Sequence, residues 1–168
     1  MSTELRTERL ILGPLVPEDL EDYVELYADP DVVRYIGDGL PGTREDAVEW
    51  LERTLRRNAV EGWEMRTVRL HDGTFVGRCG IAVHELEHGA EREVGYILAR
   101  SRWGLGYATE AATAVRDHAI RELGLRRLIA LIAFGNEASV HVAEKLGMTF
   151  EREVRFHDHP TRMFALEV

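Results

Sequence analysis

The sequence predicts an α/β fold of the mixed-sheet type, in which helices flank a mostly antiparallel sheet that includes one parallel strand–helix–strand unit. Two stretches of strand-forming residues, 63–70 and 74–83, are separated by an Asp-Gly pair, the signal of an antiparallel hairpin. A strand at 92–98, a helix at 107–123 and a strand at 125–134 follow. Because the last strand is apolar on both faces, we expect it to lie inside a sheet covered on both sides.

The residues before the hairpin predict one strand and two helices. The strand covers 5–15, and a Gly-Pro pair closes its apolar run. A helix begins at Pro17, because proline suits a first helical position and acidic residues follow it, and ends near an Asp-Pro pair. A short helical turn over 31–36 leads to a glycine-rich and proline-containing loop over 37–42 that could move over a site. Thr43 then caps a helix with a charged, solvated face.

The residues after the hairpin complete the sheet. We expect a polar connection over 84–90 before the parallel unit. The helix of that unit has an inner face of small residues, which allows close packing against a sheet or a ligand. Asn136 caps a further helix, and Gly147 ends it. Strands at 149–156 and 163–168 form a closing hairpin.

The composition suits one domain over residues 1–168. The chain has 45% hydrophobic and 30% charged residues, and it lacks a run of the roughly 20 apolar residues that a membrane span needs. No secretion signal is recognisable at the N-terminus, and the one cysteine, Cys79, is expected to be a buried structural thiol, so we expect a cytoplasmic protein. The net charge of −9 disfavours nucleic acid as a partner and is compatible with a cationic small substrate.

The stretch Trp103-Gly104-Leu105-Gly106 leads into the helix that begins near Tyr107. Two glycines one residue apart let the backbone approach a ligand closely, and the first amides of a helix point out of its end. Together they predict a site for an anionic group, with phosphate as the expected guest. A Gly-x-Gly pair alone is weak support, because such pairs also occur by chance.

Four motifs follow one another along the chain: Gly95-Tyr96-Ile97-Leu98, Trp103 to Ala111, Asn136-Glu137-Ala138-Ser139 and Glu144-Lys145-Leu146-Gly147-Met148. In this order they resemble the GNAT N-acetyltransferase superfamily, specifically the branch of the ribosomal-protein alanine N-acetyltransferases. The opening segment 7–12 is similar to the same branch, so the resemblance covers nearly the whole chain. It implies a GNAT-like fold with a splayed sheet, in whose slot the pantetheine arm of acetyl-CoA pairs with strand backbone.

The resemblance also implies which residues bind acetyl-CoA, the expected cosubstrate. The glycine loop would hold its pyrophosphate, although Trp103 stands where the superfamily pattern has Arg or Gln, and Leu105 where relatives are often basic. Asn136 resembles a cofactor-contacting asparagine, yet it also suits an ordinary N-cap. Arg100 and Arg102 could assist at the phosphates or be surface charges. The expected cofactor residues are Ile97, Leu98, Trp103, Leu105, Gly106, Tyr107, Ala108, Thr109, Asn136, Ser139 and Lys145.

Catalysis is expected to be direct attack of a neutral amine on the thioester, without a covalent enzyme intermediate. Ser139 resembles the general acid that relatives place near the departing sulfur; an ordinary first-turn serine is the alternative. Glu93 is our choice of base, because it lies on the strand beside the slot. A solvated strand-edge glutamate, with backbone carbonyls and water as the base, is the alternative. The acceptor would be a protein N-terminal α-amine or a small cationic amine.

Two rival functions belong to other classes. A noncatalytic domain that binds and senses acyl-CoA would keep the glycine loop but tolerate loss of Glu93 and Ser139. A nucleotide-binding module is disfavoured, because no lysine follows the glycines as in a P-loop. For the N-acetyltransferase we expect a monomer or a homodimer.

The seven histidines do not predict a metal site. The segment 157–160, His-Asp-His-Pro, indicates a polar turn between the last strands. His84 and His88 are expected in a loop, where they could touch a substrate. The acceptor pocket is expected to be built by the first two helices, the loop over 37–42 and the turn near His157.

Overall fold

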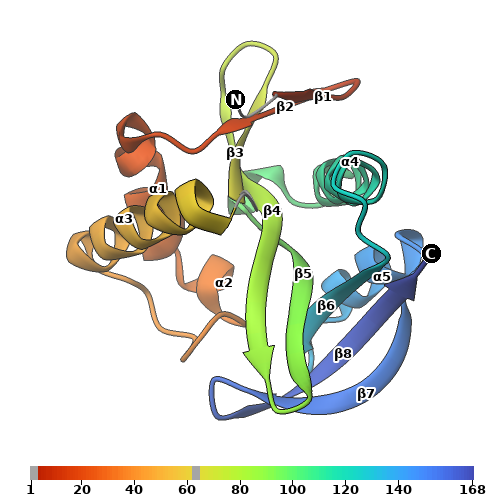
Figure 1. Ribbon diagram of the computed structural model, residues 1–168. Coiled ribbons are helices and arrows are strands. Elements are labelled where there is room, and N and C mark those ends of the chain that lie inside the picture. Colours follow the sequence, from red (N-terminus) through yellow and green to blue (C-terminus); the bar gives the residue numbers. More distant parts are fainter. Residues whose placement is uncertain (1–3, 62–64) are drawn as a thin grey trace.

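An eight-stranded sheet runs through the part of the chain that the structure describes, residues 4–61 and 65–168 of a computed structural model (Figure 1). The strand order is β1-β2-β3-β4-β5-β6-β8-β7. Neighbouring strands are antiparallel except β5 and β6, which confirms the mixed, mostly antiparallel sheet. The strands are β1 (Leu5–Arg6), β2 (Leu10–Pro14), β3 (Met65–Leu70), β4 (Phe75–Leu86), β5 (Gly89–Leu98), β6 (Arg127–Ala133), β7 (Thr149–Phe156) and β8 (His159–Glu167).

The parallel contact between β5 and β6 is short. Its register consists of the pair Glu93 and Ile129. Two residues further along β6, the amide of Leu131 donates a hydrogen bond to the Glu93 carboxylate (3.2 Å). A side chain thus takes the place that a β5 carbonyl would have in a continuous ladder, and the two strands separate directly after Glu93. This is the splayed sheet that the resemblance implies.

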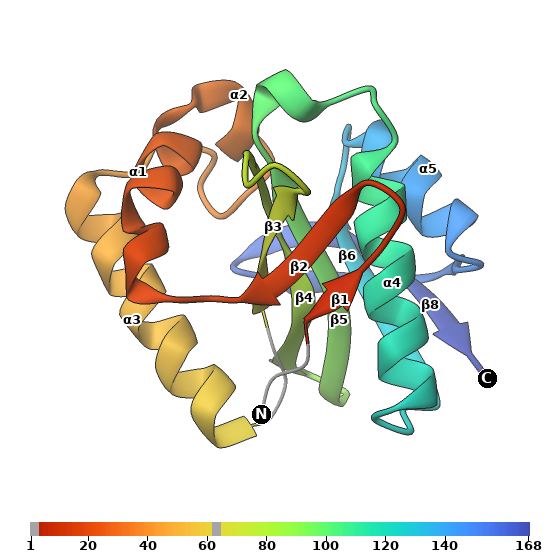
Figure 2. The same ribbon diagram turned by 90° about the horizontal axis from the view of Figure 1, so that it is seen from above.

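Helices cover both faces of the sheet (Figure 2). On one face lie α1, α2 and α3, and on the other lie α4 and α5. Short 3₁₀ turns precede α1 and the glycine loop, at Pro17–Asp19 and Arg100–Arg102. The helices are α1 (Leu20–Ala28), α2 (Pro30–Val33), α3 (Arg44–Glu61), α4 (Tyr107–Arg121) and α5 (Glu137–Lys145).

The two helical layers pack differently against the sheet. The buried positions of α4 are all alanine or valine, as the sequence predicts, so this helix lies close to β4 and β5. On the other face, the fully buried ring of Tyr23 packs against Trp50 and Phe75, with ring centroids 4.9 and 5.6 Å away. Burial of one such ring contributes roughly 1.5–3 kcal/mol, which anchors α1 and α3 to the sheet.

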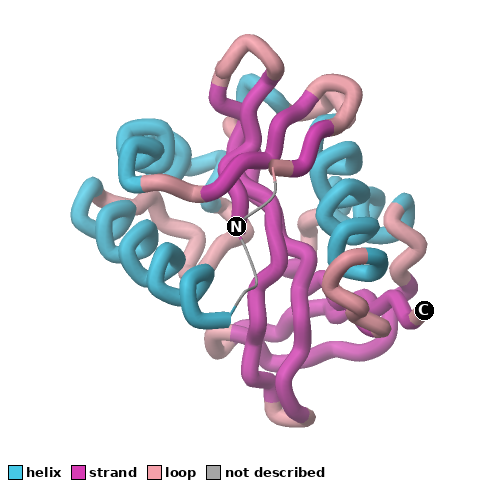
Figure 3. The backbone as a smooth tube through the Cα atoms, turned by 45° about the horizontal axis from the view of Figure 1, so that its top comes forward, coloured by secondary structure: helices cyan, strands magenta, loops and turns pink. Residues whose placement is uncertain are grey.

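The predicted polar connection over 84–90 is wrong. β4 continues to Leu86 and β5 begins at Gly89, so the two strands form one long hairpin with a two-residue turn (Figure 3). The backbone groups of His84 and Glu91 still pair across this hairpin, because the ladder depends on the backbone and not on side-chain polarity. Gly89 has a φ of 125°, a conformation that glycine adopts readily at a turn.

Two other strands differ from the prediction. The strand expected over 5–15 is two strands, β1 and β2, because the amide and hydroxyl of Thr7 both donate to the Leu10 carbonyl and turn the chain. β8 begins earlier than predicted, at His159, directly after a two-residue turn with positive φ at both positions. The start of the strand predicted over 63–70, at Trp63, lies outside the described residues.

Candidate active site

A cleft of about 1260 Å³ opens where β5 and β6 separate. Residues of α2 and the segment after it, of α3 and of β4 line it on one side of the sheet. The glycine loop, α4 and α5 line it on the other side. Every predicted site residue except Leu105 borders this cleft: Glu93, Ile97, Leu98, Trp103, Gly106, Tyr107, Ala108, Thr109, Asn136, Ser139 and Lys145.

The glycine loop, residues 103–106, fits an anionic group held by backbone amides. Gly104 and Gly106 have φ values of 70° and 82°, which strain any residue with a Cβ. α4 begins directly after the loop, so the amides of its first turn have no partner within the helix and point out of its end. A Cβ on Gly106 would lie 3.2 Å from Nη2 of Arg9, so the guanidinium would have to move by a few tenths of an ångström to admit it.

Trp103 anchors the loop. Its indole Nε1 donates a hydrogen bond to the carbonyl of Leu98, the last residue of β5 (2.9 Å). The ring remains 48% exposed. Where the superfamily pattern has a charged or polar side chain, this chain therefore ties the loop to the strand, and positive charge for an anion must come from other residues.

Lys145 and Arg102 bring positive charge to the cleft. Lys145, the only lysine of the sequence, ends α5 and also borders a shallow hollow of about 490 Å³ beside Gly106 and Thr109. Arg100, the other arginine considered from the sequence, lies away from the cleft. It pairs with the carboxylates of Asp29 and Asp31 instead (3.3 and 2.7 Å).

Arg9 supports the glycine loop from behind, a role that the sequence analysis missed. Its amide and Nε donate to the two carboxylate oxygens of Glu110 (2.8 and 2.7 Å), and its Nη1 donates to the Leu105 carbonyl (2.8 Å). The guanidinium lies 4.6 Å from the centre of the Tyr107 ring. Burial alone would raise the pKa of Glu110, but hydrogen bonds from Thr7 and Arg9 lower it below its usual value. We name this group the Arg9 clasp: Thr7, Arg9 and Glu110.

The clasp explains the place of Leu105. Its side chain is 49% exposed and does not line the cleft, whereas its carbonyl is held by Arg9. The signal for the clasp was present in the motif over residues 7–12, and an acidic residue in the first turn of α4 was a second signal. Neither pattern says which residues pair across a hundred positions.

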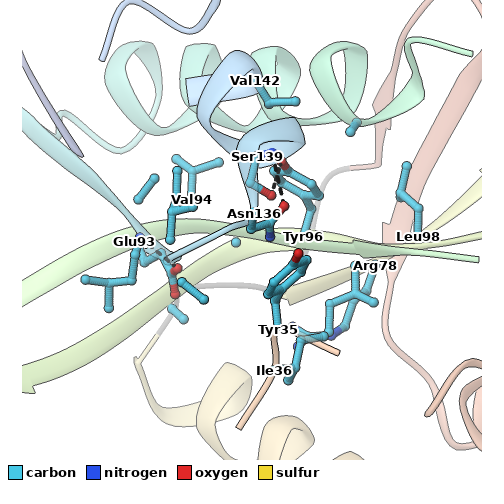
Figure 4. A pocket seen from close by; sticks show the side chains of 18 of the residues that line it. Tyr35, Ile36, Arg78, Glu93, Val94, Tyr96, Leu98, Asn136, Ser139 and Val142 are labelled. Atoms are coloured by element: carbon cyan, nitrogen blue, oxygen red, sulfur yellow. Dashed lines mark hydrogen bonds between the residues drawn. The ribbon is translucent and has the colours of Figure 1, made fainter. Parts of the chain in front are cut away.

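Ser139 is linked to a half-buried tyrosine (Figure 4). The hydroxyl of Tyr96 on β5 donates to Ser139 Oγ (3.0 Å), and burial raises the pKa of Tyr96 to about 12, against the effect of this hydrogen bond. The Asn136 side chain accepts a hydrogen bond from the Ser139 amide (3.3 Å), so the N-cap interpretation of Asn136 is confirmed. The sequence predicted no role for Tyr96, although this residue belongs to the first of the four motifs.

Glu93 is paired with a histidine. One carboxylate oxygen lies 2.7 Å from His84 Nε2, and the other accepts the Leu131 amide. The side chains of Glu93 and His84 are only 17% and 19% exposed. The rings of Phe156 and His84 pack in a T-shaped arrangement, with centroids 4.8 Å apart. A carboxylate and an imidazole in direct contact beside a cleft can accept and pass on a proton.

The histidines of the β4–β5 hairpin separate into two groups. His84, expected in a loop, lies on β4 and lines the cleft. His88 lies in the turn, outside the residues that line the cleft, and contacts Glu91 (2.9 Å).

Tyr35, which follows α2, spans the cleft. Its hydroxyl donates a hydrogen bond to the carbonyl of Gly135, after β6 (3.1 Å).

Other predicted features were also located. Cys79 is fully buried, and burial raises its pKa to about 12, in agreement with a structural thiol. Within 4–61 and 65–168, no cluster of three or more His, Cys, Asp or Glu side chains is arranged to hold a metal ion. Over the same residues, no helix has the length and apolar character to cross a membrane.

Comparison with known proteins identifies the family. Residues 9–149 match the acetyltransferase (GNAT) domain. The chain is 36% identical to YkkB of Bacillus subtilis, over 96% of this chain and 94% of that protein. An acetyltransferase from Agrobacterium tumefaciens has a similar structure, with a TM-score of 0.85 at 28% identity and coverage of 100% and 96% of the two chains.

A more distant structure shares the fold. RimL, a ribosomal L7/L12 α-N-protein acetyltransferase, was solved in complex with coenzyme A, and it covers 99% of this chain and 98% of its own with a TM-score of 0.82 at 17% identity. The family match spans most of the chain, including the glycine loop, β5 and α5. This chain belongs to the GNAT acetyltransferase family.

Proposed function

We propose that this protein is an acetyl-CoA-dependent N-acetyltransferase that moves the acetyl group to a primary amine by direct attack on the thioester. One observation carries the proposal: a proton-accepting pair and a proton-donating pair lie on opposite faces of the strand that borders the cleft. Glu93 and Tyr96 are three residues apart on β5, so their side chains leave the strand on opposite sides. Each has a polar partner within 3.0 Å.

The residues present fit acetyl-CoA as a substrate. The glycine loop and the first turn of α4 offer backbone amides to its pyrophosphate, and Lys145 and Arg102 add positive charge. The edge of β5 that faces β6 has its register pair at Glu93, so the backbone of Ile97 and Leu98 is available to the amides of the pantetheine arm. Asn136 then acts as a cap that holds Ser139 in place.

The chemistry assigns a role to each pair. The amine nitrogen forms a bond to the acetyl carbon, the carbon–sulfur bond breaks, and the Glu93 and His84 pair takes the amine proton. The thiolate receives a proton from Ser139, which takes the Tyr96 hydroxyl proton in its place, and Tyr96 then recovers a proton from water. Tyr96 holds the Ser139 hydroxyl from behind. An α-amine, with a pKa of about 8, is about half neutral near pH 8 and needs less help from the base than a lysine amine at about 10.4.

Binding and turnover measurements test the proposal. Titration calorimetry with acetyl-CoA and coenzyme A measures binding, and release of free thiol measures turnover over peptides with free N-termini, alkylamines, diamines, polyamines and amino acids. We expect micromolar binding and thiol release with at least one class of amine. Binding without turnover on any amine, with no acetylated product by mass spectrometry, would favour the acyl-CoA sensor. Absence of binding at millimolar acetyl-CoA would overturn the proposal altogether.

We also propose that residues 1–168 act as one acetyltransferase domain, as a monomer or a homodimer. The sheet supports this, because its strands come from both the first and the last residues of the described chain. Light scattering after size-exclusion chromatography distinguishes the two oligomeric states.

A further inference from the structure

Arg78 is a cation of the cleft with few partners. It lies on β4, half-buried, with its guanidinium 4.8 Å from the centre of the Trp50 ring and 5.9 Å from that of Tyr27. Its Nη1 contacts the thioether sulfur of Met65 (3.2 Å), which is a weak acceptor. Among the described residues, Arg78 Nε is buried and has no hydrogen-bond partner.

Tyr27 presents a second polar atom of the same kind. Within the described part of the chain, its hydroxyl is buried and its proton has no acceptor. Burial raises the pKa of Tyr27. The charge of Arg78 and the close approach of the Arg78 guanidinium to the hydroxyl oppose this rise, and the charge of Arg53 does so to a smaller extent. A buried donor without an acceptor bears its full desolvation penalty. Two such donors in one wall of a cleft are the complement of an anionic group, for which the planar fork of an arginine is well suited.

The charge of the cleft agrees with this interpretation. Of the described residues that line it, six are Arg or Lys and three are Asp or Glu, although the whole chain carries a net charge of −9. Arg102 and Lys145 belong to the cofactor side, and the other four cations come from the α2 end, α3 and β4. The acidic composition of the chain, which suggested a cationic acceptor, is therefore not the composition of the cleft.

The position of Arg78 relative to Glu93 defines an acceptor path. Arg78 pairs with Ile97, which lies four residues after Glu93, so both side chains leave the sheet on the same face, about 13 Å apart along the strands. Gly95 lies between these two levels and has no side chain, which leaves the floor of the path open. In Figure 4, Glu93 and Arg78 lie on either side of Tyr35.

We infer that the acceptor is a primary amine that also carries an anionic group, and that this group binds Arg78 and Tyr27 while the amine faces Glu93. The inference rests on the proposed N-acetyltransferase activity and names its substrate class. Carboxylate and phosphate share the required chemistry. The spacing favours an acceptor whose amine and anion are separated by several bonds, because the long side chains of Arg78 and Glu93 shorten the distance between their strand positions.

Matched acceptors test the inference. Thiol release is measured with ω-aminocarboxylates of increasing length, ω-aminoalkyl phosphates, and the n-alkylamines and α,ω-diamines of the same lengths. We expect kcat/KM for at least one anionic series to exceed that for its uncharged and dicationic counterparts by about 10- to 100-fold, the range of a charge-assisted hydrogen bond. The preferred series separates carboxylate from phosphate, and the preferred length reports the distance from amine to anion.

Two variants assign the preference to the site. Arg78→Met keeps much of the side-chain volume over Trp50 but removes the charge, and Tyr27→Phe removes only a hydroxyl. Both should lower kcat/KM for the anionic acceptor, by about 10- to 100-fold and about 3- to 10-fold, and leave kcat/KM for the alkylamine and KM for acetyl-CoA within about threefold. Arg121→Met, at an exposed arginine at the end of α4 outside the cleft, is the control and should change none of these values.

The outcomes separate this inference from the proposed function. Turnover of alkylamines or diamines at least as fast as that of every anionic acceptor would overturn the inference and leave the N-acetyltransferase intact. Equal losses for anionic and uncharged acceptors in Arg78→Met and in Tyr27→Phe would also overturn it, since they would show a packing role. Absence of turnover with every acceptor in the wild type would contradict both.

Discussion

Arg9 and Glu110 are joined by two hydrogen bonds across 101 positions of sequence, through the amide and the Nε of the arginine. The same guanidinium donates to the Leu105 carbonyl. The turn between β1 and β2 therefore sets the position of the glycine loop, and a carbonyl oxygen that would repel an anion is held by a cation instead. The Arg9 clasp acts on the cofactor site from outside the cleft.

Replacement of Arg9 should weaken the use of acetyl-CoA more than the chemistry. For Arg9→Ala we expect KM for acetyl-CoA to rise by about tenfold, as for loss of a charge-assisted hydrogen bond, with kcat within about threefold. S-acetylpantetheine lacks the pyrophosphate, so its kcat/KM should be unchanged. Steady-state kinetics with both thioesters measure the effect, and Arg6→Ala, at an exposed arginine on β1 that pairs with Glu4, is the control. A parallel loss with both thioesters would mean that Arg9 acts on overall stability only.

Gly106 should tolerate no side chain. Gly106→Ala places a Cβ at a φ of 82° and 3.2 Å from Arg9 Nη2, so we expect a loss of about 1–2 kcal/mol in unfolding free energy and a larger loss in affinity for coenzyme A. Gly73→Ala has a comparable φ of 90° in the β3–β4 turn with nothing within 4 Å, so it reports strain alone. Chemical denaturation and calorimetry give the two quantities. If Gly106→Ala has the stability of Gly73→Ala and an unchanged affinity for coenzyme A, the glycine loop does not bind the phosphates.

Glu93→Gln should lower kcat by about 10²- to 10⁴-fold, the range for loss of a general base, with little change in KM for acetyl-CoA. Glutamine can still accept the Leu131 amide, so the unfolding free energy should stay close to that of the wild type. The remaining activity should rise steeply with pH, because the amine must then lose its proton to solvent. Rate measurements from pH 6 to 10 on both proteins provide the comparison.

A second Glu–His pair on the same hairpin supplies the control for Glu93. Glu91 contacts His88 at 2.9 Å, close to the distance between Glu93 and His84, but neither residue lines the cleft. Glu91→Gln should leave kcat within about threefold. If Glu91→Gln and Glu93→Gln reduce kcat alike, the pairs serve the hairpin and not the reaction.

Ser139→Ala should reduce turnover and spare binding. Without the hydroxyl, the departing thiolate loses its nearest proton donor, and we expect kcat to fall by about 10- to 100-fold with calorimetric affinity for coenzyme A unchanged. Tyr96→Phe should have a smaller effect in the same direction, since the tyrosine acts through Ser139. A thioester with a more acidic thiol needs less protonation, so its rate should fall less in Ser139→Ala. An equal fall with both thioesters would argue against an acid role.

Arg127 should make stability depend on acid pH. Burial would raise the pKa of Glu91, but hydrogen bonds from Arg127 and His88 lower it below the usual 4.5. Its contribution to the unfolding free energy is therefore complete above about pH 4.5 and is lost as the pH falls through the lowered value. Arg127→Met should cost on the order of 2 kcal/mol at pH 7 and less at pH 3, as measured by urea denaturation. A constant difference at both pH values would contradict this account.

Local chemistry made much of the fold predictable. An Asp-Gly pair determines the β3–β4 turn, alanines determine how α4 lies on the sheet, and Asn136 caps α5 through its own side chain. The glycine loop was recognisable for the same reason, since its positive φ values are properties of single residues.

The parts that were missed depend on pairing between distant segments. The β4–β5 hairpin extends through polar residues, so His84 was expected in a loop although it lies beside Glu93. The partners Arg9 and Glu110 are separated by most of the chain. Arg78 belongs to the cleft because α1 and α3 fold over it, and no spacing within β4 indicates this.

The hydrogen bond from the Leu131 amide to Glu93 gives one carboxylate two duties. It closes the first gap between the diverging strands, and it is the proposed base. A shorter acid at position 93 would leave the Leu131 amide unmatched and withdraw the carboxylate from His84 in the same change. A substitution at position 93 therefore changes both the separation of β5 from β6 and the proposed base. We expect relatives that use other acceptors to differ in the walls of the cleft and to keep this glutamate where the strands separate.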